Sequence, residues 1–194
     1  SGWGYASPGT TTYTGDYATA FGQNTTAAGK GSVAFGWGAD FSLENQTGYT
    51  YSGDYVHSPD PQHYYRPNSG LTGAYGDYSA TFGSRTFAQG TNSVAMGSMT
   101  NAIGDNSVAY GYQTYAIGKD SIAFGNNTMA NGNRSTAFGS QTEAFAQDSL
   151  AFGIDTKAYG RRSTAFGSHT LATGEKATTF GTSTTAQSEN STAF

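Results

Sequence analysis

A block of five residues returns every fourteen positions over most of the chain. Ser79-Ala80-Thr81-Phe82-Gly83 recurs as Ser93-Val94-Ala95-Met96-Gly97, and the spacing continues to Ser191. A second block in the same rhythm, such as Thr100-Asn101-Ala102-Ile103-Gly104, lies between successive copies. The repeating unit is therefore a pair of seven-residue halves, S-x-A-F-G-x-x and T-x-A-x-G-x-x, called here the Ser half and the Thr half. A fixed period of this kind is typical of solenoids and other repeat arrays.

A seven-residue spacing also occurs in coiled coils, but the residues in these halves are poor helix formers. A glycine in the interior costs a helix about 1 kcal/mol, and Thr, Val and Phe favour strands. Each half is better explained as a short strand that ends at glycine and is followed by a two-residue turn. Suitable turn residues stand there, for example Asp105-Asn106, Asn126-Asn127, Asn133-Arg134 and Glu175-Lys176. Two strands and two turns make one coil, so we expect an all-β, parallel β-solenoid of 14-residue coils.

The small size of most side chains fits a narrow solenoid interior. Gly, Thr, Ala and Ser account for 103 of the 194 residues, whereas Leu, Ile, Val and Phe account for 24. So few large apolar residues exclude an ordinary globular core. A formal net charge of only −4 and an aromatic content of 14 % argue against a disordered chain.

Alternation along each strand assigns the side chains to two faces. The first, third and fifth positions of each half are Ser or Thr, Ala and Gly, and we predict that they line the inside of the coil. The second and fourth positions then point outward. In the Thr half these positions are mixed, as in Glu143 with Phe145 and Lys157 with Tyr159, which is typical of a solvent face. In the Ser half they carry no charge.

The outward positions of the Ser half form a continuous apolar stripe in a stacked solenoid. An exposed stripe of this length exceeds what a monomer usually tolerates, so we expect it to be buried against copies of the same chain in a cyclic homo-oligomer. We call its fourth positions the aromatic ladder. The predicted interface consists of Phe21, Phe35, Phe82, Met96, Tyr110, Phe124, Phe138, Phe152, Phe166 and Phe180, together with the second-position residues Val94, Val108, Ile122 and Leu150.

One coil is interrupted by a long insertion of different composition. Ser32 and Ser79 are 47 residues apart, which is one period plus 33 residues. Residues 40–71 are rich in Tyr, His and Pro, and a loop of this length is often functional. Tyr and Arg are typical of binding hot spots, which predicts a receptor site. An equal alternative is that these tyrosines pack on the roll or on a neighbouring subunit. The candidate receptor-binding residues are Tyr49, Tyr51, Tyr55, His57, His63, Tyr64, Tyr65 and Arg66, with Tyr75, Phe87 and Tyr115 on the nearby solvent face.

The repeats resemble the head domain of YadA-like trimeric autotransporter adhesins, whose units read approximately as N-S-V-A-I-G followed by S-x-A-x-G. Asn92-Ser93-Val94-Ala95-Met96-Gly97 and Asn106-Ser107-Val108-Ala109-Tyr110-Gly111 carry the resemblance, which covers about three quarters of the chain. It implies a left-handed parallel β-roll that trimerises along the ladder, an adhesive role and a place at the bacterial cell surface, on the outer membrane. It also implies a host partner, either a cell-surface glycoprotein such as an immunoglobulin-like receptor or a matrix protein such as collagen. The ladder departs from the family, because Phe stands where Ile is frequent.

The expected organisation has four parts. Residues 1–17 form an N-terminal cap or a degenerate first coil, residues 18–39 and 72–194 form coils, and residues 40–71 form the insertion. The last repeat stops at Ala193-Phe194, so a stalk and a membrane anchor are expected outside this chain. Membrane attachment is expected only through that anchor.

Other function classes find little support in the residues. The chain has no cysteine, which excludes disulfides and thiol chemistry, and its mild acidity argues against a nucleic-acid partner. His57, Asp60 and His63 are weak metal candidates because prolines break their spacing, so we expect no metal, no cofactor and no enzymatic activity. Two alternatives to an adhesin remain. One is a structural trimeric fibre segment of a phage tail or surface layer, and the other is an ice-binding solenoid, which needs outward threonines rather than the predicted inward column.

Overall fold

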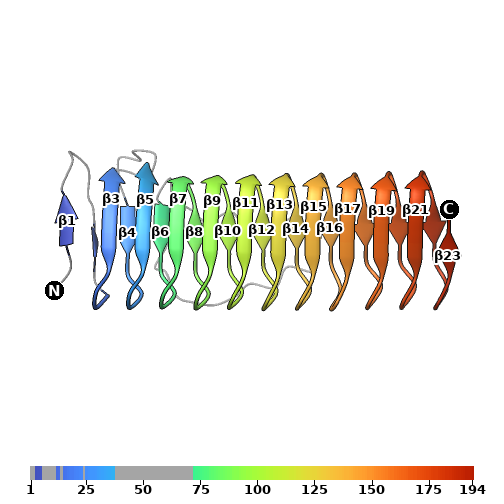
Figure 1. Ribbon diagram of the computed structural model, residues 1–194, viewed down its shortest axis with the longest axis horizontal. Coiled ribbons are helices and arrows are strands. Elements are labelled where there is room, and N and C mark those ends of the chain that lie inside the picture. The colour runs from blue at the N-terminus through green and yellow to red at the C-terminus, as the bar shows by residue number, and fades with distance from the viewer. Residues whose placement is uncertain (1–2, 6–11, 14, 24, 38–71) are drawn as a thin grey trace, which may run out of the picture.

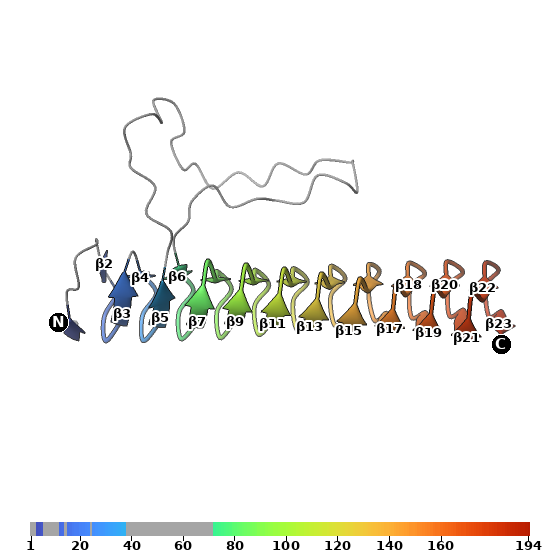
Figure 2. The same cartoon turned by 90° about the horizontal axis from the view of Figure 1, so that it is seen from above.

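A computed structural model describes residues 3–5, 12–13, 15–23, 25–37 and 72–194, and every regular element in these ranges is a strand. The strands form two parallel sheets, one of twelve strands and one of eleven, stacked as a rod (Figure 1). Seen from above, the chain passes from one sheet to the other and back in each coil (Figure 2). The prediction of an all-β parallel solenoid is confirmed.

The Ser halves build the twelve-stranded sheet, called here the Ser-half sheet. Its full strands have five residues, because the backbone stays extended one residue beyond the glycine. In order they are β1 (Trp3–Tyr5), β3 (Thr19–Gln23), β5 (Val33–Trp37), β7 (Ala80–Ser84), β9 (Val94–Ser98), β11 (Val108–Tyr112), β13 (Ile122–Asn126), β15 (Thr136–Ser140), β17 (Leu150–Ile154), β19 (Thr164–Ser168), β21 (Thr178–Thr182) and β23 (Thr192–Ala193).

The Thr halves build the eleven-stranded sheet, called here the Thr-half sheet. Its strands have two or three residues. In order they are β2 (Thr12–Tyr13), β4 (Thr25–Ala27), β6 (Thr72–Ala74), β8 (Phe87–Ala88), β10 (Asn101–Ala102), β12 (Tyr115–Ala116), β14 (Met129–Ala130), β16 (Glu143–Ala144), β18 (Lys157–Ala158), β20 (Leu171–Ala172) and β22 (Thr185–Ala186).

The strand register repeats the sequence period. Phe124 pairs with Phe138, fourteen residues on, and equivalent residues pair in the same way from β9 to β21. Phe35 of β5 pairs directly with Phe82 of β7, so the stacking of the roll continues across the insertion. In the first coil, Trp3 pairs with Thr19, sixteen residues on.

The interior is made of small side chains, as the sequence predicts. From Ala88 to Ala172 the third-position alanines of both halves are completely buried and form one continuous cluster. The first-position serines and threonines are buried beside them, including the column Thr86, Thr100, Thr114, Thr128, Thr142 and Thr156. An ice-binding solenoid needs a column of threonines that faces outward. This column faces inward, which argues against the ice-binding alternative.

The glycines of the two halves lie in different environments, which corrects part of the predicted face assignment. In the Thr half the fifth-position glycine is mostly buried, as at Gly90 and Gly118, although Gly104 is half-buried. In the Ser half it is not: Gly97 is exposed and Gly83 is half-buried. There the backbone takes φ values from 110° to 157° while the residue stays in register within its strand, as Gly83 does opposite Gly97. Only glycine adopts these angles readily.

The predicted two-residue turns are confirmed, and their second residues have left-handed backbone. Asn106, Asn127, Arg134 and Lys176 have φ between 54° and 56°. Residues other than Asn and Gly rarely adopt this conformation, yet the turns of this chain place Arg, Lys and Tyr there. Stacking holds most of them, because their amides donate to carbonyls in the preceding coil, as Asn106 N–H does to Thr91 O at 2.8 Å. The amide of Arg85 donates instead to the hydroxyl of Thr72.

A helix long and apolar enough to cross a membrane is absent from the described part of the chain.

Candidate interaction surfaces

The aromatic ladder lies on the outer surface of the Ser-half sheet. Stacking joins Tyr110, Phe124, Phe138, Phe152 and Phe166, with neighbouring ring centroids 4.7–5.0 Å apart and ring planes within 8° of parallel. These distances match the spacing of hydrogen-bonded strands, so each ring sits on the next one along the rod. Met96 interrupts the aromatic series between Phe82 and Tyr110.

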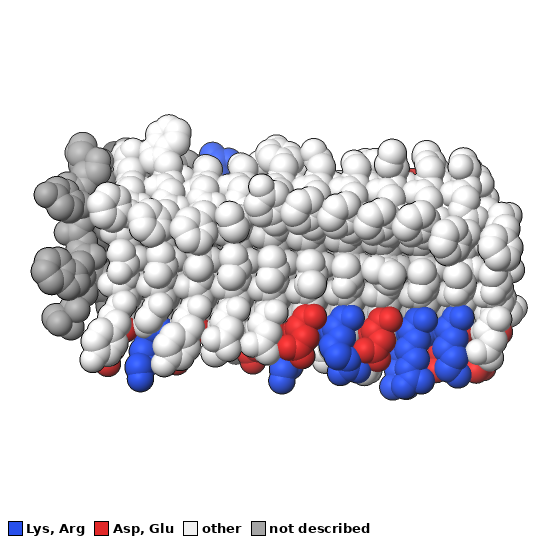
Figure 3. All heavy atoms as spheres, in the orientation of Figure 1, with Lys and Arg blue, Asp and Glu red and all other residues white. Residues whose placement is uncertain are grey.

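The ladder residues remain partly exposed in the single chain. The aromatic members from Phe21 to Phe180 keep 37–46 % of their surface open to solvent, and Met96 is half-buried. In the row beside them Ile122, Leu150 and Val108 are also exposed, while Val94 is half-buried. Figure 3 shows this face as a broad uncharged band along the rod. The predicted apolar stripe therefore lies on one face.

Charged side chains gather along one edge of the same face (Figure 3). They stand in the turns that lead into the Ser-half strands, where Asp120, Arg134, Asp148, Arg162 and Lys176 follow one another in successive coils. Arg134 donates twice to Asp148, from Nε to Oδ1 at 2.6 Å and from an Nη to Oδ2 at 2.9 Å. Opposite charges therefore lie next to each other along this edge.

The pair of Arg134 and Asp148 makes stability depend on pH at the acid end. Hydrogen bonding from Arg134 lowers the pKa of Asp148, which outweighs a desolvation effect that raises it. A carboxylate whose folded pKa is below its unfolded pKa stabilises the fold above the unfolded pKa, and this contribution is lost as the pH falls through the folded value. We therefore expect Asp148→Asn to flatten the fall in Tm below about pH 4. Thermal unfolding of both proteins from pH 6 to pH 2 tests this, and identical pH profiles would contradict it.

The Thr-half sheet is less exposed than the sequence predicts. Phe87, a candidate receptor-binding residue, keeps only 4 % of its surface open to solvent, so its expected place on the solvent face is wrong. The ring of Tyr75 stacks against it, with centroids 6.3 Å apart. Asn101 and Met129, at equivalent positions in other coils, are also buried. Tyr75 and Tyr115 are half-buried.

The other candidate receptor-binding residues lie outside the described residues. These are Tyr49, Tyr51, Tyr55, His57, His63, Tyr64, Tyr65 and Arg66. The weak metal candidates His57, Asp60 and His63 lie outside them too. Within the described ranges, His, Asp and Glu side chains form no group of three that is suited to a metal ion.

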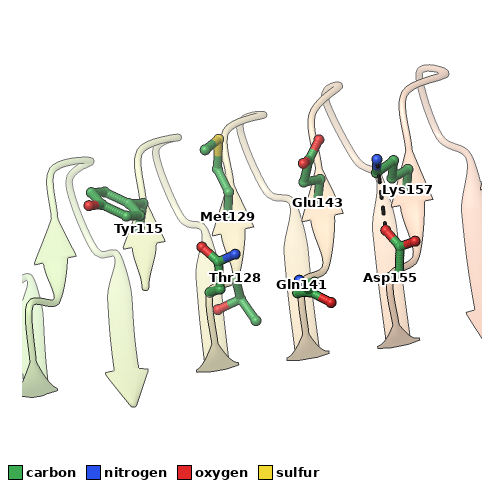
Figure 4. Close-up of a pocket in the computed structure, with 8 residues that line it drawn as sticks. Tyr115, Thr128, Met129, Gln141, Glu143, Asp155 and Lys157 are labelled. Carbon is green, nitrogen blue, oxygen red and sulfur yellow. Dashed lines mark ion pairs between the residues drawn. The ribbon is translucent and has the colours of Figure 1, made fainter. Parts of the chain in front are cut away.

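A shallow groove, which the sequence analysis did not identify, lies on the Thr-half sheet between β12 and β18 (Figure 4). Tyr115, Met129, Glu143 and Lys157 come from four successive strands, and Asn127, Gln141 and Asp155 come from the turns beside them. Of these turn residues only Asn127 is named in the sequence analysis, as part of a two-residue turn. The sequence signal for the groove was the fourteen-residue spacing of Asn127, Gln141 and Asp155, which places them in three consecutive turns.

Two aromatic rings stand next to this groove on the same sheet. Phe145 and Tyr159 pack edge to face, with centroids 5.8 Å apart and ring planes at 68°. The hydroxyl of Tyr159 donates to a carboxylate oxygen of Glu143. Both rings are exposed, Phe145 to 49 % and Tyr159 to 38 %. The Thr-half sheet thus combines exposed aromatic rings with polar side chains.

Comparison with known families agrees with the geometry. A model described as the YadA head domain repeat (2 copies) matches residues 14–39, 88–114, 116–142, 146–170 and 172–194. These segments cover 128 of the 194 residues and lie on both sides of the insertion. No curated protein matches the chain.

Proposed function

The chain belongs to the YadA head domain family, and from this membership we propose that it is the head of a trimeric autotransporter adhesin, displayed outside the outer membrane to attach the cell to host surfaces. Heads of this family form trimers and bind host factors, and they serve as adhesive and structural domains rather than as enzymes. The observation that carries the proposal is the aromatic ladder, an apolar face that runs along the rod and is open in the single chain.

Burial of the ladder supplies the energy for assembly. An aromatic side chain offers about 200 Å² in total, so an exposed fraction near 40 % leaves about 80 Å² per ring, worth ~2 kcal/mol when buried. Ten ladder positions give about 800 Å² per chain, the size of a stable interface on one partner. In a threefold ring each chain uses two different edges toward its two neighbours, while the ladder sheets of all three face the axis.

Assembly along the ladder leaves the Thr-half sheet facing outward. We propose that the insertion, residues 40–71, contacts the host partner through Tyr49, Tyr51, Tyr55, His57, His63, Tyr64, Tyr65 and Arg66, and that Tyr75 and Tyr115 of the roll add to this contact. Tyrosine and arginine are frequent at binding hot spots. Three copies on one rigid rod convert weak single contacts into strong attachment through avidity. An immunoglobulin-like receptor and a matrix protein such as collagen are the two partner classes.

Deleting the insertion tests this function. We expect a variant in which residues 38–71 are replaced by a single glycine to stay trimeric, because this restores the 14-residue spacing from Ser32 to Ser79 and β5 already pairs with β7 across the insertion. Its mass should be three times that of its own shortened chain, which is below the 20.2 kDa of the full chain. The same variant should lose binding to host cells by about 100-fold, since avidity amplifies the loss of each contact. Light scattering gives the mass, and flow cytometry with labelled protein gives the binding.

The same experiment distinguishes the adhesin from a structural fibre segment. A fibre segment of a phage tail or surface layer needs the stacked roll and the ladder but not the aromatic insertion. If the deletion variant stays trimeric and still binds host cells fully, the proposal that the insertion binds the receptor is wrong. Tyr51→Ala, Tyr55→Ala, Tyr64→Ala and Tyr65→Ala, made singly, then locate the contact within the insertion if the deletion removes binding.

A further inference from the structure

The groove on the Thr-half sheet has the size of a small ring rather than of a protein interface. Its volume is about 180 Å³, below the range of roughly 300–1,000 Å³ that is usual for pockets that hold drug-sized ligands. It lies on the sheet opposite the aromatic ladder, so a trimer that buries the ladder leaves the groove open. A protein partner needs about 800 Å² of contact on each side, far more than this groove offers.

The polar lining of the groove is matched to a ligand that both donates and accepts hydrogen bonds. The side-chain amides of Asn127 and Gln141 each present a donor and an acceptor, in successive turns on one side of the groove. On the other side Glu143 accepts and Lys157 donates (Figure 4). Hydroxyl groups, which donate and accept at the same atom, complement such a mixed set.

The charged side chains of the groove have partners within the chain and together carry a net charge of −1. Lys157 Nζ lies 3.8 Å from Asp155 Oδ1, and Glu143 accepts the hydrogen bond from the Tyr159 hydroxyl. Two carboxylates against one ammonium leave no excess of positive charge. The groove therefore suits a neutral ligand better than a phosphate, a sulfate or an acidic sugar.

The exposed aromatic pair adds an apolar surface at the border of the groove. Phe145 follows Glu143 by two residues and Tyr159 follows Lys157 by two residues, so both rings share a face with the groove residues. The hydrogen bond to Glu143 holds the ring of Tyr159 beside the groove. Aromatic rings bring a large apolar area with little loss of side-chain entropy when they bind a ligand.

We propose that the groove and the aromatic pair together bind one neutral sugar ring of an oligosaccharide. A sugar ring has hydroxyl groups around its edge for the amides and charged groups, and apolar C–H faces for Phe145 and Tyr159. The three copies in a trimer repeat the site around the rod, which suits glycans that are displayed at high density. This site is separate from the insertion and does not depend on it.

Saturation-transfer NMR with simple glycosides tests the site on the 194-residue protein. The probes are the methyl glycosides of galactose, mannose and N-acetylglucosamine, with the methyl glycoside of sialic acid as an acidic comparison. We expect saturation of at least one neutral glycoside. We also expect Gln141→Ala, and separately the double variant Phe145→Ala/Tyr159→Ala, to weaken its binding about tenfold or more, which corresponds to ~1.4 kcal/mol or more.

Matched variants separate binding from folding. Leu171→Ala lies one strand further along the same sheet and outside the groove, so it should keep the signal. Tyr159→Phe keeps the ring but loses the hydrogen bond to Glu143, so it should weaken binding less than the double alanine variant and provides a comparison if an alanine variant unfolds. The variant without the insertion should also keep the saturation signal, so a failure of the receptor proposal can be told apart from a failure of the sugar site.

Several outcomes would overturn the sugar site. These are no saturation of any neutral glycoside, a signal unchanged by both groove variants, or stronger binding of the sialic acid glycoside. Loss of binding to host cells by Phe145→Ala/Tyr159→Ala that persists after enzymatic removal of the cell-surface glycans would also do so, since it would assign this face to a protein partner.

Discussion

Phe166→Asp should convert the proposed trimer into a monomer. Phe166 stacks between Phe152 and Phe180, at centroid distances of 5.0 and 4.9 Å, in the middle of the C-terminal part of the ladder. In the proposed trimer the substitution brings three carboxylates together at a dry axis, and burying an unpaired ion costs several kcal/mol. Each ring removed also forfeits ~2 kcal/mol of apolar burial. Light scattering should then give the mass of one chain, 20.2 kDa, across the micromolar range.

Thr173→Asp is the matched control for this experiment. Thr173 occupies the fourth position of the Thr half in the same coil, seven residues after Phe166, and is exposed on the opposite sheet. It receives the same carboxylate at the same height on the rod, but outside the proposed interface, so the trimer should persist. Equal masses for Phe166→Asp and Thr173→Asp, whether both trimeric or both monomeric, would contradict the assembly through the ladder.

The difference between the two outward faces was readable from the sequence because it depends on residue type alone. Val, Ile, Leu, Thr and Phe fill the outward Ser-half positions in coil after coil, whereas Glu143 and Lys157 interrupt the Thr-half positions. Because the period is strictly fourteen residues, equivalent positions of successive coils lie in a row along the rod. The strand register across residues 38–71 was likewise predictable, because Ser32 and Ser79 are separated by one period plus 33 inserted residues.

What the sequence did not predict depends on contacts between coils. Phe87 was placed on the solvent face by alternation, which is correct for the direction of its side chain, but Tyr75 of the preceding coil stacks on it. Alternation also placed the Ser-half glycines inside, although with positive φ they stay in the strand and are exposed or half-buried. The groove was missed for the same reason, since it forms between residues of successive coils, such as Asn127, Gln141 and Asp155, which are fourteen residues apart in the sequence.

Gly139→Ala should destabilise the roll more than most single substitutions. A Cβ on Gly139 would stand 1.9 Å from the carbonyl oxygen of Gly153 in the next coil, and the backbone there has φ +133°. The backbone strain and the forced separation of two hydrogen-bonded coils together cost about 3–6 kcal/mol. Because a domain of this size loses roughly 2–4 °C in Tm for each kcal/mol, thermal unfolding followed by circular dichroism should show a fall of about 10 °C or more.

Gly181→Ala separates the effect of close stacking from that of backbone conformation. Gly181 has the same place in its half and φ +110°, but in the 194-residue chain its Cβ would meet nothing nearer than Phe194 C and Thr184 Cγ2, both at 3.7 Å. Only the cost of the positive φ remains, about 1–3 kcal/mol, so its Tm should fall by clearly less than that of Gly139→Ala. Equal losses would mean that the repeated glycine serves the turn alone. A larger loss at Gly139 shows that glycine also sets how closely successive coils approach, and hence the ring-to-ring spacing of the ladder that the trimer is proposed to bury.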